Sequence, residues 1–131
     1  MNDALSQLVE YRLARAKETL QEAHELAVGA HWNGVANRLY YACFYAATAW
    51  LVREGLSSPK HTGVRSLVNQ RLIMPGLITK ELGVLYNDLF ELRQESDYED
   101  FVHQASDEVA PLIPQAAQFV TRIAELIAGN L

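Results

Sequence analysis

The sequence predicts an all-α protein, an up-and-down bundle of four long helices and one short helix. Apolar residues recur at intervals of three and four positions through the long segments, which is the spacing of one face of an α-helix. No window alternates between apolar and polar residues for long enough to predict a strand. With 131 residues, half of them hydrophobic, residues 1–131 fit one domain with a single core.

The first two predicted helices fill the N-terminal part of the chain. The first covers residues 4–28, where one apolar stripe is flanked by charged faces, and Gly29 follows as a C-terminal stop signal. Asn33 is the expected N-cap of the second, because an asparagine oxygen accepts a hydrogen bond from the first turn. This helix runs to about Glu54 and ends before Gly55.

A shorter helix follows the second one. Residues 57–63 predict a loop, and the short helix covers about residues 64–72, since Pro75 and Gly76 then interrupt the pattern. Thr79 is the expected cap of the fourth helix.

The C-terminal part contains the last long helices. The fourth helix runs to about Ser96 on a narrow leucine stripe, and the final helix ends at Asn130. Two signals compete for the start of the final helix. Residues 106–108 resemble an N-terminus, whereas Pro111 and Pro114 fit best in a first turn.

The most informative stretch, residues 37–45, places an arginine and three tyrosines in an otherwise apolar helix. Tyr40 falls on the apolar stripe, while Arg38, Tyr41 and Tyr45 share a second stripe about a quarter to a third of a turn away. This second stripe suits an oligomer interface or an anionic ligand. The alternative is that the tyrosines pack at the edge of the core and Arg38 pairs with a neighbouring carboxylate.

The charge is unevenly distributed. The net charge of −5 argues against a protein that coats nucleic acid regardless of sequence, because phosphate neutralisation supplies most of that affinity. Residues 53–71 nevertheless carry a net +3, and the rest of the chain carries −8. Such a cationic patch can bind one phosphate-bearing group, although an ordinary solvated surface would look the same.

The motifs of several common sites are absent from the sequence. It has no Gly-rich phosphate loop, no cysteine pair, no Gly-x-Ser-x-Gly and no His-Glu-x-x-His. Asp100 and His103 have the spacing of a di-iron motif, but only half of such a site exists. His24 and His31 are expected at the surface. We therefore expect no metal site and no cofactor.

The single cysteine and the longest apolar stretch indicate the compartment. Cys43 lies on the buried stripe, which is typical of an inert core thiol in a reducing cytoplasm. Residues 42–52 are too few to span a bilayer, and the N-terminus has no basic region before an apolar one. We expect a cytoplasmic protein without a membrane partner.

A second constellation lies at the end of the fourth helix. Arg93 borders the leucine stripe, and Asp97 follows one turn later, so the two can pair and fix the guanidinium. A helix-end salt bridge of small value is the alternative. Because a bundle sets the second and fourth helices side by side, we expect Arg38, Tyr41 and Arg93 to converge with the Lys60–His61 loop.

Three motifs in this order resemble the HEPN domain family, specifically its small free-standing prokaryotic branch. They are Arg38-x-Tyr-Tyr-Ala, Lys60-His61-x-Gly63 and Arg93-x-x-x-Asp97-Tyr98, and the resemblance spans essentially the whole chain. It implies an up-and-down helical bundle, usually a homodimer, often made beside a minimal nucleotidyltransferase that acts as its antitoxin.

The resemblance also implies a chemistry. Many HEPN proteins are metal-independent RNases that use an Arg-x(4–6)-His motif from each subunit of a dimer. Here the first histidine after Arg93 is His103, and ten residues of continuous helix would carry it about 15 Å along the axis and off the Arg93 face. His61 is therefore the better candidate for the general acid or base.

The predicted site combines two groups of residues. The catalytic candidates are Arg93, His61 and Tyr98, and the ligand-binding candidates are Arg38, Tyr41, Lys60 and Asp97. Metal-free RNA cleavage needs a group that takes the 2′-hydroxyl proton and cations that face the developing phosphorane charge.

Three functions are compatible with these residues. The first is a toxin-like RNase acting on RNA, with tRNA as one substrate. The second is a catalytically silent module that binds a nucleotide or its nucleotidyltransferase partner, and the third is a plain structural bundle. The displaced histidine favours the second over the first for chemistry. Arg93 and Tyr98 favour a ligand-linked role over the third.

Overall fold

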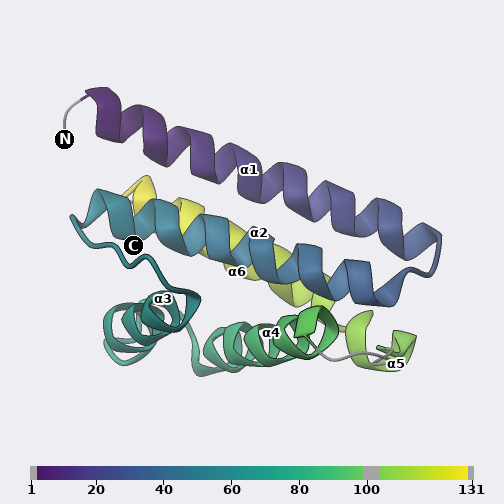
Figure 1. Cartoon of the computed structure of the whole chain (residues 1–131). Helices are drawn as coiled ribbons and strands as arrows, with labels where there is room; N and C mark the ends of the chain where they lie inside the picture. The colour runs from purple at the N-terminus through teal and green to yellow at the C-terminus, as the bar shows by residue number, and fades with distance from the viewer. Residues whose placement is uncertain (1–2, 99–103, 130–131) are drawn as a thin grey trace.

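The computed structural model describes the backbone of residues 3–98 and 104–129, and the side chains of all of these except residues 95–98. Every regular element in these ranges is helical, which confirms the predicted all-α bundle (Figure 1). In chain order the elements are α1 (Asp3–Val28), α2 (Trp32–Arg53), α3 (His61–Val68), the π-helix η1 (Asn69–Ile73), α4 (Lys80–Tyr98), α5 (Ser106–Val109) and α6 (Leu112–Ile127). Within these ranges no helix is long and apolar enough to span a bilayer.

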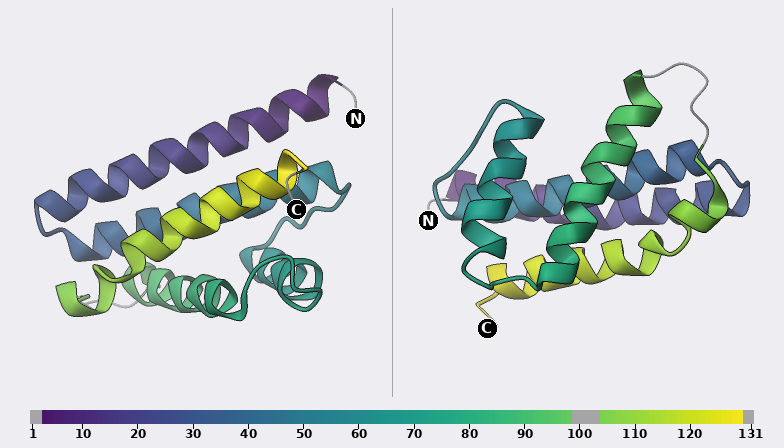
Figure 2. Two further views of the ribbon diagram at one scale, coloured as in Figure 1. Left: turned by 180° about the vertical axis from the view of Figure 1, so that it is seen from behind. Right: turned by 90° about the horizontal axis from the view of Figure 1, so that it is seen from below.

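Helix α2 lies at the centre of the bundle. It packs against α1, α4 and α6, and α1 and α6 run along it. Figure 2 shows α3 and α4 crossing beneath this layer rather than running along it. Because neighbours cover α2 on several sides, its second half is buried around most of its circumference, which explains why an almost uninterrupted apolar sequence follows Tyr45.

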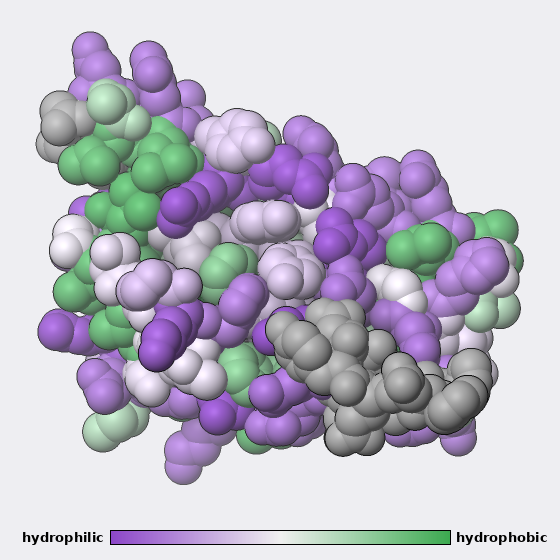
Figure 3. All heavy atoms as spheres, viewed as in Figure 1, coloured by the Kyte–Doolittle hydropathy of each residue, from purple (hydrophilic) through white to green (hydrophobic). Residues whose placement is uncertain are grey.

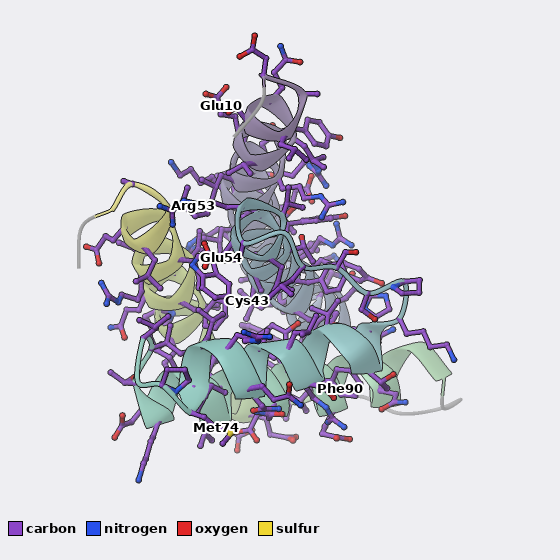
Figure 4. The ribbon with its side chains drawn as sticks, turned by 90° about the vertical axis from the view of Figure 1, so that its left-hand side faces the viewer. Glu10, Cys43, Arg53, Glu54, Met74 and Phe90 are labelled. Carbon is purple, nitrogen blue, oxygen red and sulfur yellow. The ribbon has the colours of Figure 1, made fainter. Side chains whose placement is uncertain are left out.

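The core is filled by large side chains from α2, α4 and α6. Tyr86 of α4 and Phe119 of α6 are fully buried and stack with their ring centroids 5.5 Å apart. Cys43 of α2 lies in the same interior, with its Sγ 4.0 Å from the carbonyl oxygen of Ala116 (Figure 4). Burial raises the pKa of the Cys43 thiol, as is typical of a structural cysteine.

The start of α2 differs from the prediction. The helix begins at Trp32 with His31 at the N-cap, so the prediction of Asn33 as the cap was wrong. Asn33 lies in the first turn, and its Oδ1 accepts a hydrogen bond of 2.6 Å from the backbone N–H of Gln104. A tertiary contact thus uses the oxygen that a cap would have used.

Helix α3 also begins earlier than the sequence indicated. Its first residue is His61, so the loop predicted over residues 57–63 ends at Lys60. Beyond Val68 the chain continues as η1, which extends the predicted end from Leu72 to Ile73. The Nδ2 of Asn87 on α4 donates to Oδ1 of Asn69 at 3.2 Å and ties η1 to the neighbouring helix.

The starts of the later helices follow their sequence signals, but their ends differ from the prediction, since α4 ends at Tyr98 rather than about Ser96 and α6 at Ile127 rather than Asn130. The Oγ1 of Thr79 accepts a hydrogen bond of 3.2 Å from the N–H of Leu82, which confirms the predicted cap. The two competing signals before the final helix are both correct, because residues 106–109 form α5 and Pro111 is the N-cap of α6. Arg53 donates to the carbonyl oxygen of Leu126 at 3.1 Å and joins the end of α2 to the end of α6 (Figure 4).

Gly63 gives the first testable prediction. A Cβ at this position would lie 2.8 Å from the Cβ of Ser58 and would collide with its Oγ. Alanine normally stabilises a helix relative to glycine, but here we expect Gly63→Ala to lower the free energy of unfolding by about 1 to 3 kcal/mol because of overpacking. Urea denaturation measures this loss.

A double variant provides the control for that prediction. Adding Ser58→Gly removes the side chain that the new methyl group would strike, so most of the lost stability should return. A Gly63→Ala protein more stable than the wild type would show that Gly63 is not tightly packed against Ser58.

Candidate functional site

Tyr40 joins the two principal catalytic candidates. Its side chain is fully buried on α2, and its hydroxyl lies 2.8 Å from Nδ1 of His61, the first residue of α3. The guanidinium carbon of Arg93, on α4, lies over the same ring, 5.0 Å from its centroid. Three helices therefore bring His61 and Arg93 to one tyrosine.

His61 is held by aromatic side chains of α2. Its ring centroid is 4.6 Å from that of Phe44 and 5.7 Å from those of both Tyr40 and Tyr41. A tyrosine hydroxyl can either donate a hydrogen bond to an unprotonated imidazole nitrogen or accept one from a protonated nitrogen. The Tyr40 hydroxyl can therefore hold His61 in the same orientation in either tautomer.

Arg93 places a positive charge within the bundle. Its side chain is only 3% exposed, and its guanidinium carbon is 5.9 Å from the Phe90 ring centroid as well as 5.0 Å from that of Tyr40. Cation–π contacts of a desolvated guanidinium contribute about 2 kcal/mol. Since arginine remains charged at any physiological pH, this positive charge is permanent.

Arg38 and Tyr41 extend the cluster toward α1. The Nη1 of Arg38 forms an ion pair of 3.2 Å with Oε1 of Glu22, as in the carboxylate-paired alternative considered from the sequence. Its guanidinium carbon is also 5.3 Å from the Tyr41 ring centroid. The Tyr41 ring centroid in turn lies 5.2 Å from that of Tyr40. Arg38 therefore contacts Tyr41, and Tyr41 contacts the tyrosine that binds His61.

The remaining candidates are only partly placed. Lys60 is the exposed N-cap residue of α3, next to His61. The side chains of Asp97 and Tyr98 lie outside the described residues, as does His103, so the Arg93–Asp97 pair and the roles of these residues stay predictions. Among the described side chains, no three from His, Cys, Asp and Glu are grouped as a metal site would require.

Two residues of this cluster were not predicted from the sequence. Tyr40 was assigned to the apolar stripe, and Phe44 was not considered, yet both contact the His61 ring. A tyrosine on an apolar stripe is itself a signal, because a buried phenol needs a hydrogen-bond partner. What the sequence could not indicate is that the partner lies 21 positions away, at the start of another helix.

The Tyr40 hydroxyl should affect stability at alkaline pH. Burial raises its pKa to about 12, whereas an unfolded tyrosine titrates near pH 10. Between these values the unfolded chain loses the proton and the folded chain keeps it, so stability is full below about pH 10 and falls as the pH rises toward 12. Tyr40→Phe should make this fall less steep.

Urea denaturation at several pH values from neutral to strongly alkaline tests this prediction. Burial, and secondarily Tyr40 itself, raises the pKa of Tyr86, so removing the Tyr40 hydroxyl also lowers the Tyr86 contribution and changes the fall in stability in the same direction. If the free energy of unfolding falls equally steeply with pH in the wild type and in Tyr40→Phe, the prediction is wrong.

Comparison with known proteins adds independent information. The model of the HEPN domain family matches residues 9–126. A UPF0332 protein of Thermotoga maritima is 38% identical over 120 residues, covering 92% of this chain and 91% of its own length. A second UPF0332 protein, from Gloeobacter violaceus, is 36% identical and covers 87% of this chain and 91% of its own. A Methanocaldococcus jannaschii protein named "Putative toxin MJ0605" is 27% identical, covering 94% and 91% of the two chains.

Proposed function

Because the chain belongs to the HEPN domain family, we propose that it is the toxin-like component of a toxin–antitoxin pair and cleaves RNA without a metal ion. Two relatives from Methanocaldococcus jannaschii carry toxin names, and each aligns with 94% of this chain. The antitoxin of such a pair would be a nucleotidyltransferase, as the family resemblance implies.

One observation carries the proposed chemistry, the contact of His61 and Arg93 with Tyr40. RNA cleavage through the 2′-hydroxyl requires a base that takes its proton, an acid that protonates the leaving 5′-oxygen, and cations that stabilise the phosphorane. An imidazole can both accept and donate a proton, and the Arg93 guanidinium supplies fixed positive charge over the Tyr40 ring that His61 contacts.

The hydrogen bond to Tyr40 assigns roles to the two imidazole nitrogens. With Nδ1 engaged by the hydroxyl, Nε2 is the nitrogen that would exchange a proton with RNA. With Nδ1–H donating to the Tyr40 oxygen, the unprotonated Nε2 can take the 2′-hydroxyl proton and form an imidazolium. When the protonated Nε2 then gives its proton to the leaving 5′-oxygen, Nδ1–H still donates to Tyr40 and the ring returns to the neutral state. Lys60, beside His61, would contribute further positive charge toward phosphate, whereas the charge of Arg38 is compensated by its ion pair with Glu22.

The test is an RNA cleavage assay with the purified protein and a tRNA pool, with and without a chelator. The proposal predicts cleavage that persists in chelator and leaves 2′,3′-cyclic phosphate ends, because the attacking group is the neighbouring 2′-hydroxyl. The absence of cleavage, or cleavage that the chelator abolishes, would contradict it.

A second function is favoured by the burial of Arg93. An arginine that is only 3% exposed stabilises its own bundle as readily as it binds a phosphate, and no histidine follows Arg93 at the family spacing. The chain would then be a catalytically silent module that binds a nucleotide or a nucleotidyltransferase. A stable complex with a nucleotidyltransferase partner, together with no RNA cleavage by the free protein, would support this function over the first.

We also propose that the chain is a homodimer. A hydrophobic patch lies at the end of the molecule near the N-terminal end of α1 (Figure 3). The first part of α1 also carries two exposed large side chains, Leu5 at 39% and Tyr11 at 63%. Covering such a patch with a second copy removes apolar surface from water. Light scattering at micromolar concentration should give twice the monomer mass, and a persistent monomer would contradict the dimer.

A further inference from the structure

We propose that the protein has a second anion site, separate from the His61 cluster, which holds a terminal phosphate group. It is a cavity of about 80 Å³ where α1, the second half of α2 and the loop before α3 meet. This volume is roughly the share of two to three water molecules in the liquid, so it admits a phosphate group but not a nucleobase. The described residues that line it are Arg12, Thr48, Leu51, Leu56, Ser57, Ser58 and Val64.

Arg12 is the main reason for this inference. Its side chain is half-buried, yet within the described part of the chain it makes no ion pair and no hydrogen bond. The next arginine along α1 behaves differently, since Arg15 pairs with Glu18 at 3.1 Å and with Glu22 at 3.7 Å. A guanidinium offers five N–H donors in a planar fork that matches the oxygens of a phosphate.

The loop supplies the other donors. The Ser57 hydroxyl makes no hydrogen bond with the described residues, and Ser58 Oγ has only long contacts of 3.3 and 3.4 Å with the backbone of Lys60. The Thr48 hydroxyl is already donated to the carbonyl oxygen of Tyr45 at 3.0 Å. Arg12, Ser57 and Ser58 would therefore bind the anion, and Thr48 would form part of the wall.

The charge and shape of the cavity select the ligand. None of the described residues that line it carries a carboxylate, which argues against a cation, and exposed Lys60 adds positive charge two residues beyond Ser58. Leu51, Leu56 and Val64 contribute apolar walls. A phosphodiester needs two exits for its chain, whereas a terminal phosphate needs one, so a small pocket walled by several elements favours the terminal group.

This site is distinct from the proposed cleavage chemistry and does not depend on it. Ser58 lies against Gly63 in the first turn of α3, and the same helix begins with His61. The loop and the helix start that would hold this phosphate therefore also carry His61 of the proposed RNA site. The terminal phosphate could belong to the 5′ end of an RNA or to a nucleotide, and binding experiments separate these sources.

Titration of isotope-labelled protein with inorganic phosphate, followed by NMR, tests the site directly. The amide resonances of Ser57 and Ser58 should shift, and Arg12→Ala should weaken binding by about 10- to 100-fold, the range expected for a charged hydrogen bond. Arg12→Lys keeps the charge but loses the planar fork of donors, so its affinity for phosphate should lie between those of the wild type and Arg12→Ala. Arg71→Ala changes the net charge equally at an exposed position on η1 and should leave binding within about twofold.

Competition experiments identify the source of the phosphate. A short RNA with a 5′-phosphate should displace inorganic phosphate, and the same RNA without it should not. AMP competing as well as this RNA would indicate a nucleotide site, whereas weaker competition by AMP would indicate an RNA end. His61→Ala should bind phosphate with the affinity of the wild type. Phosphate binding by this variant therefore tests the cavity separately from the cleavage mechanism.

Two outcomes would overturn the inference. One is an Arg12→Ala protein that is folded by circular dichroism and binds phosphate as the wild type does. The other is equal competition by RNA with and without the 5′-phosphate, which would show that the cavity does not recognise a terminal group.

Discussion

Replacing His61 with alanine should lower the rate of RNA cleavage by about 10²- to 10⁴-fold, the usual contribution of a general acid or base. The substitution removes the imidazole that Tyr40 holds at 2.8 Å while leaving Arg93 over the same ring. Because His61 is only half-buried at the start of a helix, the fold should survive its loss. Single-turnover rates with a labelled RNA measure the effect.

Matched variants make this prediction specific. His24→Ala removes an exposed histidine from α1 and should leave the rate unchanged, and His103→Ala should leave it largely intact. Arg93→Ala should abolish cleavage, with circular dichroism to confirm folding and Arg93→Lys to retain the charge. Normal cleavage by His61→Ala, or its loss in a folded His103→Ala protein, would mean that the wrong histidine had been assigned.

Phe119→Ala should lower the free energy of unfolding by about 3 to 5 kcal/mol, a large fraction of the stability of a domain this size. The Phe119 side chain is fully buried on α6 and stacks on Tyr86 of α4, so its removal leaves a cavity where two helices meet. Urea denaturation measures this loss, and equal dependence of the unfolding free energy on urea concentration in both proteins would show that the two transitions are comparable.

Val84 on α4 provides the control. It is 59% exposed, and Val84→Ala should change stability by no more than about 0.5 kcal/mol. A loss below about 1 kcal/mol for Phe119→Ala would contradict the position of α6 in the core.

Local signals in the sequence were sufficient for the helical architecture. The spacing of apolar residues depends only on which face of a helix is buried, so it predicted α1 over nearly its full length. Thr79 works as a cap because the bond it accepts comes from three residues away. The competing signals at Ser106 and Pro111 were each local and each correct, since they begin two successive helices.

Features that depend on distant partners were not available from the sequence. Asn33 is a good cap by type, but Gln104 uses its oxygen across 71 positions. The row of Arg38, Tyr41 and Tyr40 could be read from one helix, but the carboxylate that pairs with Arg38 is on α1. The proposed phosphate cavity combines residues of α1, α2 and a loop, none of which forms a motif alone.

The burial of Cys43 allows thiol labelling to measure how often the helical bundle opens. It is the one thiol in the chain, it is fully buried, and its raised pKa keeps it protonated at ordinary pH. A thiol-reactive dye can therefore label it only from conformations in which α2 has separated from its neighbours. The labelling rate of the unmodified protein gives the frequency of such openings, and its decrease on adding RNA, a nucleotide or an antitoxin would measure how strongly each one holds the domain closed.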